Sequence, residues 1–428
     1  MSEIISSEFN MNPNTTNGLS AEMKTYYSDY LIDNAVPNLV HDQFGQKHPI
    51  PANGGKTINF RKFVPFSKAS KPLTEGVTPD GGSLSVTNVS AEVSQYGYYV
   101  TLSDVLMLTA VDNTLVETTR LLGNQAGSTL DTVSREVLNS GTSVMYAGGM
   151  ESRNTLDVTS KLGVDDIFRA ARFLKSQNAP KIDGGYVAIV HPDVSYDLMR
   201  DEEWVDVNKY SNSGNIFNGE IGKLGGVRFV ESTEAKIFHA KDLIAGSRNL
   251  TVNSFTKTAT DTTADYGSVS SYKIVVKETI TDEDAKNLVG RKIQIVNEAA
   301  LESEWGVIYF TIGGVSASGN AIYIAESSIP ASLPFSILAN HIIYPGEAGI
   351  KGRDVYSTLV LGANAYGVTE VTGGGLEHIV KQLGSGGTAD PLNQRATAGW
   401  KGTKVCELLV DNYMVRIESV SSFESGEN

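Results

Sequence analysis

The tetrad Gly54-Gly55-Lys56-Thr57 carries the residue types that end a phosphate-binding P-loop, in which backbone N–H groups and a lysine hold phosphate. The first glycine of that motif belongs at position 50, where the chain has Ile50. A P-loop also leads into a helix, whose N-terminus receives the phosphate, but the residues from Thr57 onward alternate as in a β-strand. The tetrad therefore predicts no nucleotide site.

Other residues that could do chemistry are dispersed. Gly314-Val315-Ser316-Ala317-Ser318 lacks the last glycine of a hydrolase nucleophile elbow. Asp165-Asp166 has the place of helix-start charges, which the helix dipole favours. No two of the six histidines stand at the helical spacing of metal ligands; they are His41, His48, His191, His239, His341 and His378. We expect no catalytic residue, no cofactor and no metal site, and hence no enzyme.

Composition limits the protein classes further. A chain of 428 residues suggests two or three packed units, and its 42 glycines favour many turns and β-rich structure. The net charge of −14 argues against a sequence-specific nucleic-acid reader, which needs a basic surface. The single cysteine, Cys406, excludes an internal disulfide, and its strand-like surroundings favour a buried core thiol. The polar start and the short apolar runs predict neither a signal peptide nor a membrane span.

The most informative local pattern spans Lys56–Leu102. Two alternating stretches, with a slip of phase near Thr87–Asn88 that suggests a bulge, flank a dense turn signal at Thr74–Gly82. They predict a long β-hairpin arm that needs another surface, in the same molecule or in a neighbour, because an isolated hairpin is marginally stable. The candidate contact residues of the arm and its tip are Lys56, Arg61, Lys62, Lys68, Lys71, Thr74, Glu75, Gly76 and Asp80. Two interpretations remain open: an electrostatic clasp between subunits, or an edge strand charged against aggregation.

Four further blocks follow the arm. Asp112–Asn139 repeats apolar residues at steps of three and four, which predicts a long helix with one apolar stripe. Val164–Glu234 has an α/β pattern. Gly246–Gly352 has polar turns and short predicted strands, typical of a small β-sandwich or barrel; the strands are Tyr272–Val276, Lys292–Val296, Val307–Ile312 and Ala321–Ile324. The tail ends in two predicted strands, 396–410 and 413–418. The fold class is therefore α+β with an all-β segment.

Several phrases of the sequence resemble one family. They are Pro37–Gln46, Pro72–Gly81, Gln95-Tyr96-Gly97 with Val100–Asp104, Asp131–Asn139, Gly185–Pro192, Ile216–Gly222 and Leu376–Arg395. In this order they are similar to the major capsid proteins of tailed bacteriophages, in the group typified by the coliphage N-four coat protein. The resemblance covers about Ser20–Glu418, and Gly246–Gly352 matches poorly, which suggests an insertion.

The resemblance implies the tailed-phage capsid fold. Its parts would be an N-terminal arm and helix (1–55), an extended loop (56–102), a peripheral domain with a spine helix (103–163), an axial domain (164–245), an inserted β-domain (246–352) and a return to the axial and peripheral domains (353–428). Within this return, residues 396–418 would close the sheet of the peripheral domain. The implied partners are copies of the same chain in pentamers and hexamers, a separate scaffolding protein, a portal and a decoration protein. Packaged double-stranded DNA would lie near without specific binding, and an acidic lining would let it slide.

The leading hypothesis is therefore a major capsid protein that assembles into an icosahedral head. It would be made in the bacterial cytoplasm and end in the virion. The alternative is a decoration or adhesin-like phage structural protein that uses the β-domain of residues 246–352 for surface binding. A β-domain of that kind could bind carbohydrate or brace neighbouring capsomers.

Overall fold

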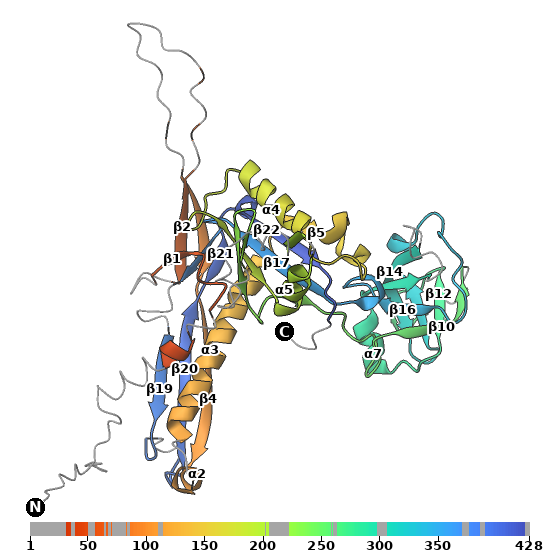
Figure 1. The fold of residues 1–428 in the computed structure, drawn as a ribbon. Helices are drawn as coiled ribbons and strands as arrows, with labels where there is room; N and C mark the ends of the chain where they lie inside the picture. Colours follow the sequence, from red (N-terminus) through yellow and green to blue (C-terminus); the bar gives the residue numbers. More distant parts are fainter. Residues whose placement is uncertain are drawn as a thin grey trace, which may run out of the picture. The chain divides into compact units, whose positions relative to one another are not determined.

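The computed structural model describes residues 31–35, 39–49, 56–63, 66, 70, 83, 86–109, 114–201, 203–204, 222–257, 259, 263–297, 306–369, 376–385 and 390–423. Helices and strands are mixed, so the predicted α+β class is confirmed (Figure 1). The chain divides into two compact units. Unit 1 contains Met1–Val137 and Tyr366–Leu409, and unit 2 contains Leu138–Ala365 and Val410–Asn428.

Unit 1 combines one long helix with three small sheets. Its elements are β1 (Gln46–His48), β2 (Thr57–Phe63), β3 (Val86–Glu92), β4 (Ser94–Ser103), α2 (Asp104–Thr109), α3 (Thr114–Leu138), β18 (Tyr366–Thr369), β19 (Leu376–Lys381), β20 (Arg395–Lys404) and β21 (Cys406–Leu408). The sheets are β1-β18-β21, β19-β20-β4 and the hairpin β2-β3. Strands from both ends of the chain therefore build this unit together.

The core of unit 1 lies between α3 and the sheet β19-β20-β4. Leu122, Ala126 and Leu130 recur at steps of four, so they share one helix face, and all three are buried. They pack with Trp400 of β20, whose ring N–H donates a 2.6 Å hydrogen bond to Gln125. This bond satisfies the indole, which would otherwise be buried without a partner.

The predicted hairpin is shorter in the structure. β2 pairs with β3 in one unbroken register, from Thr57 opposite Glu92 to Phe63 opposite Val86. The bulge predicted near residues 87–88 is therefore wrong, and the strand is interrupted at Val93 instead. Beyond Val93 the chain leaves the hairpin, and β4 pairs along its whole length with β20. Local alternation predicted both strands but could not identify a partner about 300 residues away.

Unit 2 contains a mixed sheet with helices. Its elements outside the barrel are β5 (Val144–Tyr146), α4 (Val164–Ser176), β6 (Tyr186–Val190), α5 (Pro192–Met199), β7 (Lys223–Leu224), β8 (Val227–Glu231), β9 (Ile237–Phe238), β17 (Val355–Leu361) and β22 (Met414–Ser419). The strand order is β5-β22-β17-β6-β8-β7, with β9 also on β17. Every residue of β6, β17 and β22 is buried, which is typical of a sheet covered on both faces.

The end of the chain differs from the sequence-based expectation. Residues 396–418 were predicted to close one sheet, but β20 lies in unit 1 whereas β22 pairs with β17 and β5 in unit 2. A short 3-10 turn at Asp411–Tyr413 directly precedes β22 and separates it in sequence from the strands of unit 1. The prediction is therefore wrong at this point, because strand patterns carry no information about which sheet a strand joins.

The segment between β9 and β17 forms a β-barrel in unit 2. Its elements are β10 (Leu250–Thr256), β11 (Tyr266–Gly267), β12 (Lys273–Val276), α7 (Asp282–Leu288), β13 (Lys292–Val296), β14 (Val307–Ser316), β15 (Ala321–Ile324) and β16 (Ile342–Pro345). The pairings β14-β13-β16-β10-β12-β15 return to β14 and so close a ring. The barrel has its own apolar core, rich in isoleucine and valine. Closure removes the exposed strand edges that would invite aggregation.

Short 3-10 turns complete the described elements of unit 2. They are η2 (Ala147–Gly149), η3 (Arg153–Thr155), η7 (Glu326–Ser328), η8 (Ile350–Gly352) and η10 (Asp411–Tyr413). η8 lies where the barrel segment rejoins the sheet, directly before β17. A compact turn therefore connects β16 of the barrel to β17 of the mixed sheet.

Candidate functional site

The hairpin β2-β3 has one apolar and one polar face at its root. Alternation along β2 places Ile58 and Phe60 on the buried side, and Phe60 is fully buried. A Cβ at Gly367 of β18 would lie 2.4 Å from a ring carbon of Phe60, so only glycine admits the ring there. His48 of β1 meets Phe60 edge to face, with ring centroids 4.9 Å apart. The root of the arm is therefore anchored on the sheet β1-β18-β21 of the same unit.

The other face of the hairpin root is exposed and polar. Thr57, Asn59 and Arg61 point to solvent along β2, and Ser90 of β3 donates a 2.7 Å hydrogen bond to the side chain of Asn59. Polar groups that face outward from an anchored hairpin can contact a second molecule without unfolding the root. This face therefore remains available for binding.

Only part of the predicted contact set can be located. Lys56 and Arg61 are exposed, as a clasp requires, and they lie at the root of the arm. The backbone of Lys62 belongs to β2, but its side chain lies outside the described residues. The remaining predicted residues, Lys68, Lys71, Thr74, Glu75, Gly76 and Asp80, also lie outside the described part of the chain.

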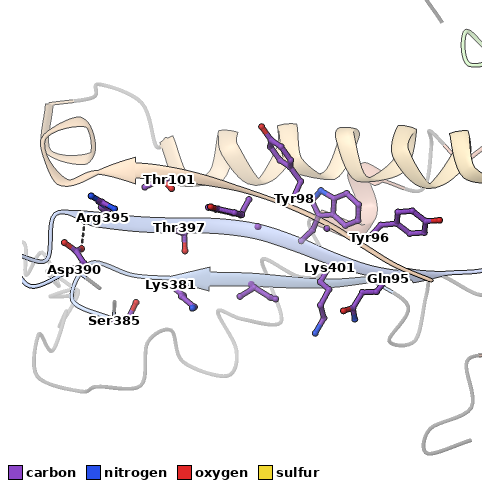
Figure 2. A pocket seen from close by; sticks show the side chains of 15 residues that line it. Gln95, Tyr96, Tyr98, Thr101, Lys381, Ser385, Asp390, Arg395, Thr397 and Lys401 are labelled. Carbon is purple, nitrogen blue, oxygen red and sulfur yellow. Dashed lines mark hydrogen bonds between the residues drawn. The ribbon is translucent and has the colours of Figure 1, made fainter. Parts of the chain in front are cut away.

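A second candidate surface was not predicted from the sequence. The sheet β19-β20-β4 packs one face on α3, and its other face borders a groove of about 650 Å³ (Figure 2). Tyr99 of β4 stands opposite Gly399 of β20, which stands opposite Ile379 of β19. A Cβ at Gly399 would lie 2.8 Å from both the carbonyl oxygen of Tyr98 and the Cβ of Tyr99, so glycine lets β20 and β4 pair closely here.

Charged groups line this groove. Lys401 forms a 3.1 Å ion pair with Glu377 across the strands, and Lys381 and Arg395 also line the groove. Asp390 accepts backbone hydrogen bonds from Gln394 and Arg395, which fixes the turn before β20 (Figure 2). Tyrosine and arginine beside apolar area are typical of protein interfaces. The alternating residues of β20 were the only local signal for this groove. They could not identify it from the sequence, because the sequence does not show that α3 covers only one face of the sheet.

A buried polar cluster ties the turn at residues 39–45 to the rest of unit 1. His41 contacts Asp131 of α3 twice, through its backbone N–H at 2.7 Å and its ring Nδ1 at 2.6 Å. The hydroxyl of Tyr366 donates to the carbonyl oxygen of His41. Asp42 accepts a 2.6 Å hydrogen bond from Ser134 and forms an ion pair with Lys404.

Burial controls the titration of this cluster. It raises the pKa of the Cys406 thiol to about 12, and the carboxylate of Asp42 acts in the same direction. Burial, helped by the Asp42 carboxylate, also raises the pKa of Tyr366 well above its usual range. Both groups therefore stay neutral near pH 7. The predicted core position of Cys406 is confirmed, since the thiol is buried.

Two general features concern the described residues only. Among them, no three His, Cys, Asp or Glu side chains gather in a way that could hold a metal ion. No helix in the same part of the chain is long and apolar enough to cross a membrane.

The comparisons with known proteins identify the family. Residues 87–301 match the phage capsid protein family, which is half of the chain, and the chain therefore belongs to this family. The sequence-based expectation of a phage capsid protein is therefore confirmed at the level of the family. The protein is thus a structural component of the virion that associates with copies of itself.

Solved capsid structures are similar at low identity. The capsid of the cyanophage P-SCSP1u gives a TM-score of 0.49 and 12% identity, over 89% of this chain and 87% of that chain. The capsid of Ralstonia phage GP4 gives 0.49 and 11%, over 90% and 87%. The capsid of the Helicobacter pylori bacteriophage KHP30 gives 0.47 and 8%, over 87% of each chain. No curated protein matches the sequence.

Proposed function

We propose that the hairpin β2-β3 is the arm by which this capsid subunit holds neighbouring copies in pentamers and hexamers of the head. The observation that carries the proposal is that one face of the hairpin is buried at its root and the other face is exposed. Phe60 and Ile58 are buried in the same unit, while Arg61 and Asn59 face solvent. An arm that is anchored at one end and polar on its free face can reach a neighbour without loss of the subunit's own fold.

Charge supports the same assignment. The chain has a net charge of −14, whereas the arm carries Lys56, Arg61, Lys62, Lys68 and Lys71. A basic arm is attracted to acidic surfaces of other copies and is repelled by other basic arms, so charge favours one register of assembly. Individual contacts of this kind are weak, at about 0–1 kcal/mol for an exposed pair, and the strength of the shell comes from their number.

The division into domains belongs to the same proposal. Residues 56–102 would be the extended loop, 103–163 the peripheral domain with α3 as spine helix, 164–245 the axial domain and 246–352 an insertion, with 1–55 as N-terminal arm and 353–428 as the return. Two observations support the insertion. A Cβ at Gly352 would lie 3.4 Å from the Cβ of Ala240 and 3.9 Å from the Cδ of Arg248. The chain therefore enters and leaves the barrel at adjacent points.

The subunit would work without catalysis and with further head proteins. We place its synthesis in the host cytoplasm and its use beside a separate scaffolding protein, a portal and a decoration protein. Contact with packaged double-stranded DNA would be non-specific, because the net charge of −14 disfavours binding to phosphates.

Deletion of the arm's tip tests the proposal. Subunits that lack residues 74–82 should keep the secondary structure of the native protein but fail to form shells. Circular dichroism and negative-stain electron microscopy measure the two properties. A replacement of residues 74–82 by glycine and serine at the same length is the matched control for spacing. Normal shells from the deletion variant would refute the role of the tip.

A second function, surface binding by a decoration or adhesin-like protein, rests on the closed barrel. A domain with its own core and adjacent entry and exit points can be carried on a surface without disturbing its host. Residues 246–352, expressed alone, should fold into a monomer. Glycan-array binding by this monomer would favour an adhesin, whereas shells that lose thermal stability without the barrel would favour bracing between capsomers.

A further inference from the structure

Asp42 and Lys404 form an ion pair inside unit 1. Lys404 is the last residue of β20 and points to the α3 side of its sheet, and Asp42 lies in the turn between residues 39 and 45. The lysine side chain is fully buried and the aspartate side chain is 9% exposed. The two residues stand 362 positions apart in the sequence. Burial of both charges needs a compensating arrangement, because desolvation of each ion costs several kcal/mol.

Side chains from α3, β18 and β21 lie beside the pair. Ser134 of α3 donates a hydrogen bond of 2.6 Å to Oδ1 of Asp42, while Lys404 contacts Oδ2. The thiol of Cys406 and the phenol of Tyr366 are close enough to feel the Asp42 charge, and burial keeps both neutral. Asp131 is engaged by His41. The pair therefore sits in a low-dielectric pocket from which water is largely excluded.

Amide formation joins a neutral amine to a carboxylic acid. Transfer of one proton from Nζ to the carboxylate converts the ion pair into the two reactants of amide formation. The groups are held in contact, and effective concentrations of about 10⁵–10⁸ M are reached in well-oriented intramolecular reactions. Exclusion of water also disfavours the reverse hydrolysis.

We propose that Nζ of Lys404 and Cγ of Asp42 join in an isopeptide bond within the subunit. The neutral amine attacks Cγ, and the oxygen that accepts from Ser134 carries the negative charge of the tetrahedral intermediate. The other oxygen holds the proton received from Nζ. It takes a second proton from the attacking nitrogen and leaves as water. The net change is one amine and one carboxylic acid to one amide and one water, so no further reactant is needed.

The bond would give the subunit a covalent tie between distant parts of its chain. It would fix the turn before β1 to the end of β20, and with Ser134 it would hold both to α3. A cross-link between positions that distant removes many conformations from the unfolded chain. The inference concerns the single subunit, so it stands apart from the proposed role of the arm.

Mass spectrometry of the full chain tests the bond. Purified subunit, incubated at neutral pH and then denatured, should weigh one water less than its sequence predicts. A tryptic digest should contain one joined species that carries Asp42 on one branch and Lys404 on the other, without cleavage at Lys404. A wild-type subunit at its full sequence mass, with no joined species, would overturn the proposal.

Two variants separate the bond from other losses of water. Lys404→Arg keeps a cation at the site but removes the amine, so it should show the full sequence mass. Lys401→Arg changes an exposed lysine of the same strand and should lose water as the wild type does. Asp-Gly steps such as Asp183-Gly184 can lose water through ring closure, but that loss would persist in Lys404→Arg and yield no joined peptide. This last pattern would also overturn the proposal. If Lys404→Arg does not fold, the joined wild-type peptide decides by itself.

Discussion

At the residue scale, Phe60 connects the arm to the body of unit 1. Its ring fills the space that Gly367 leaves open and contacts His48. We expect Phe60→Ala to lower the free energy of unfolding by about 3–5 kcal/mol, the usual cost of a phenylalanine cavity in a core. Urea unfolding followed by tryptophan fluorescence measures the change.

The exposed neighbour of Phe60 supplies the control. Thr57→Ala removes a side chain on the solvent face of β2 and should change the stability by less than about 0.5 kcal/mol. Equal effects of the two substitutions would mean that the root of the arm is not packed as described. The sequence alone predicted that residues 57–60 alternate, and it could not predict that Gly367, 307 positions after Phe60, receives the ring.

Cys406 is a second residue whose behaviour follows from burial. Its pKa of about 12 lies above that of an unfolded cysteine, so the folded protein holds the thiol proton more tightly. The stability due to this group is complete below the unfolded pKa, near 9, and falls as the pH rises toward about 12. A Cys406→Ala variant should therefore lose less stability than the wild type between these two pH values.

Reactivity gives an independent measurement of the same burial. The native thiol should react with a disulfide reagent at neutral pH only after denaturant is added, because attack requires an accessible thiolate. Rapid labelling of the native subunit would contradict the described environment of β21.

At the element scale, α3 depends on one close contact. A Cβ at Gly123 would lie 2.8 Å from the carbonyl oxygen of Leu31 and 2.9 Å from the Cβ of Asn34. Alanine is favoured over glycine in a helix by about 1 kcal/mol, but backbone atoms cannot move away from the new methyl group without loss of packing. We expect Gly123→Ala to be destabilising, by a decrease in the melting temperature of the subunit.

The exposed side of the same helix provides the comparison. Leu121 is 54% exposed, so Leu121→Ala should leave the melting temperature nearly unchanged. A rise in melting temperature for Gly123→Ala would show that helix propensity outweighs the contact with the segment at residues 31–35. Periodicity predicted α3 to within about two residues at each end, since a long amphipathic stripe is a strong local signal.

Strands were less predictable than this helix. Residues 292–296 and 321–324 were predicted with the bounds of β13 and β15, because each is a short apolar run between turns. β10, β16 and the helix α7 were not predicted. α7 has only seven residues, which is too short for a helical period to stand out, although Thr281 and Asp284 form a capping box at its start.

At the scale of the whole molecule, net charge should control association. The chain has a net charge of −14 at pH 7 and a pI near 5.0. Like charge keeps free subunits apart, and the repulsion weakens as the pH approaches the pI. We expect the assembled fraction, measured by sedimentation velocity at constant ionic strength, to increase as the pH falls from neutral toward 5.0.

Added salt should distinguish this repulsion from the attraction of the arm. Salt screens both, and Arg61→Glu replaces the attraction of this residue to acidic surfaces by repulsion. The wild type and Arg61→Glu should therefore differ most at low ionic strength and converge at high ionic strength. A difference that persists at high salt would assign Arg61 a packing role in place of an electrostatic one.

The sequence by itself determined the class of fold, the long helix, the alternating arm with its basic residues, the β-rich segment and the family. Each of these depends on a local sequence pattern: a hydrophobic period of 3.6 or 2 residues, a turn signal, or a contiguous stretch that resembles the family. The tertiary structure decided what lies between distant positions. It separated β4 from the hairpin, sent β20 and β22 to different sheets and brought Asp42 beside Lys404. Local patterns fix which residues face inward, but the partner that covers them is chosen by packing of the whole chain.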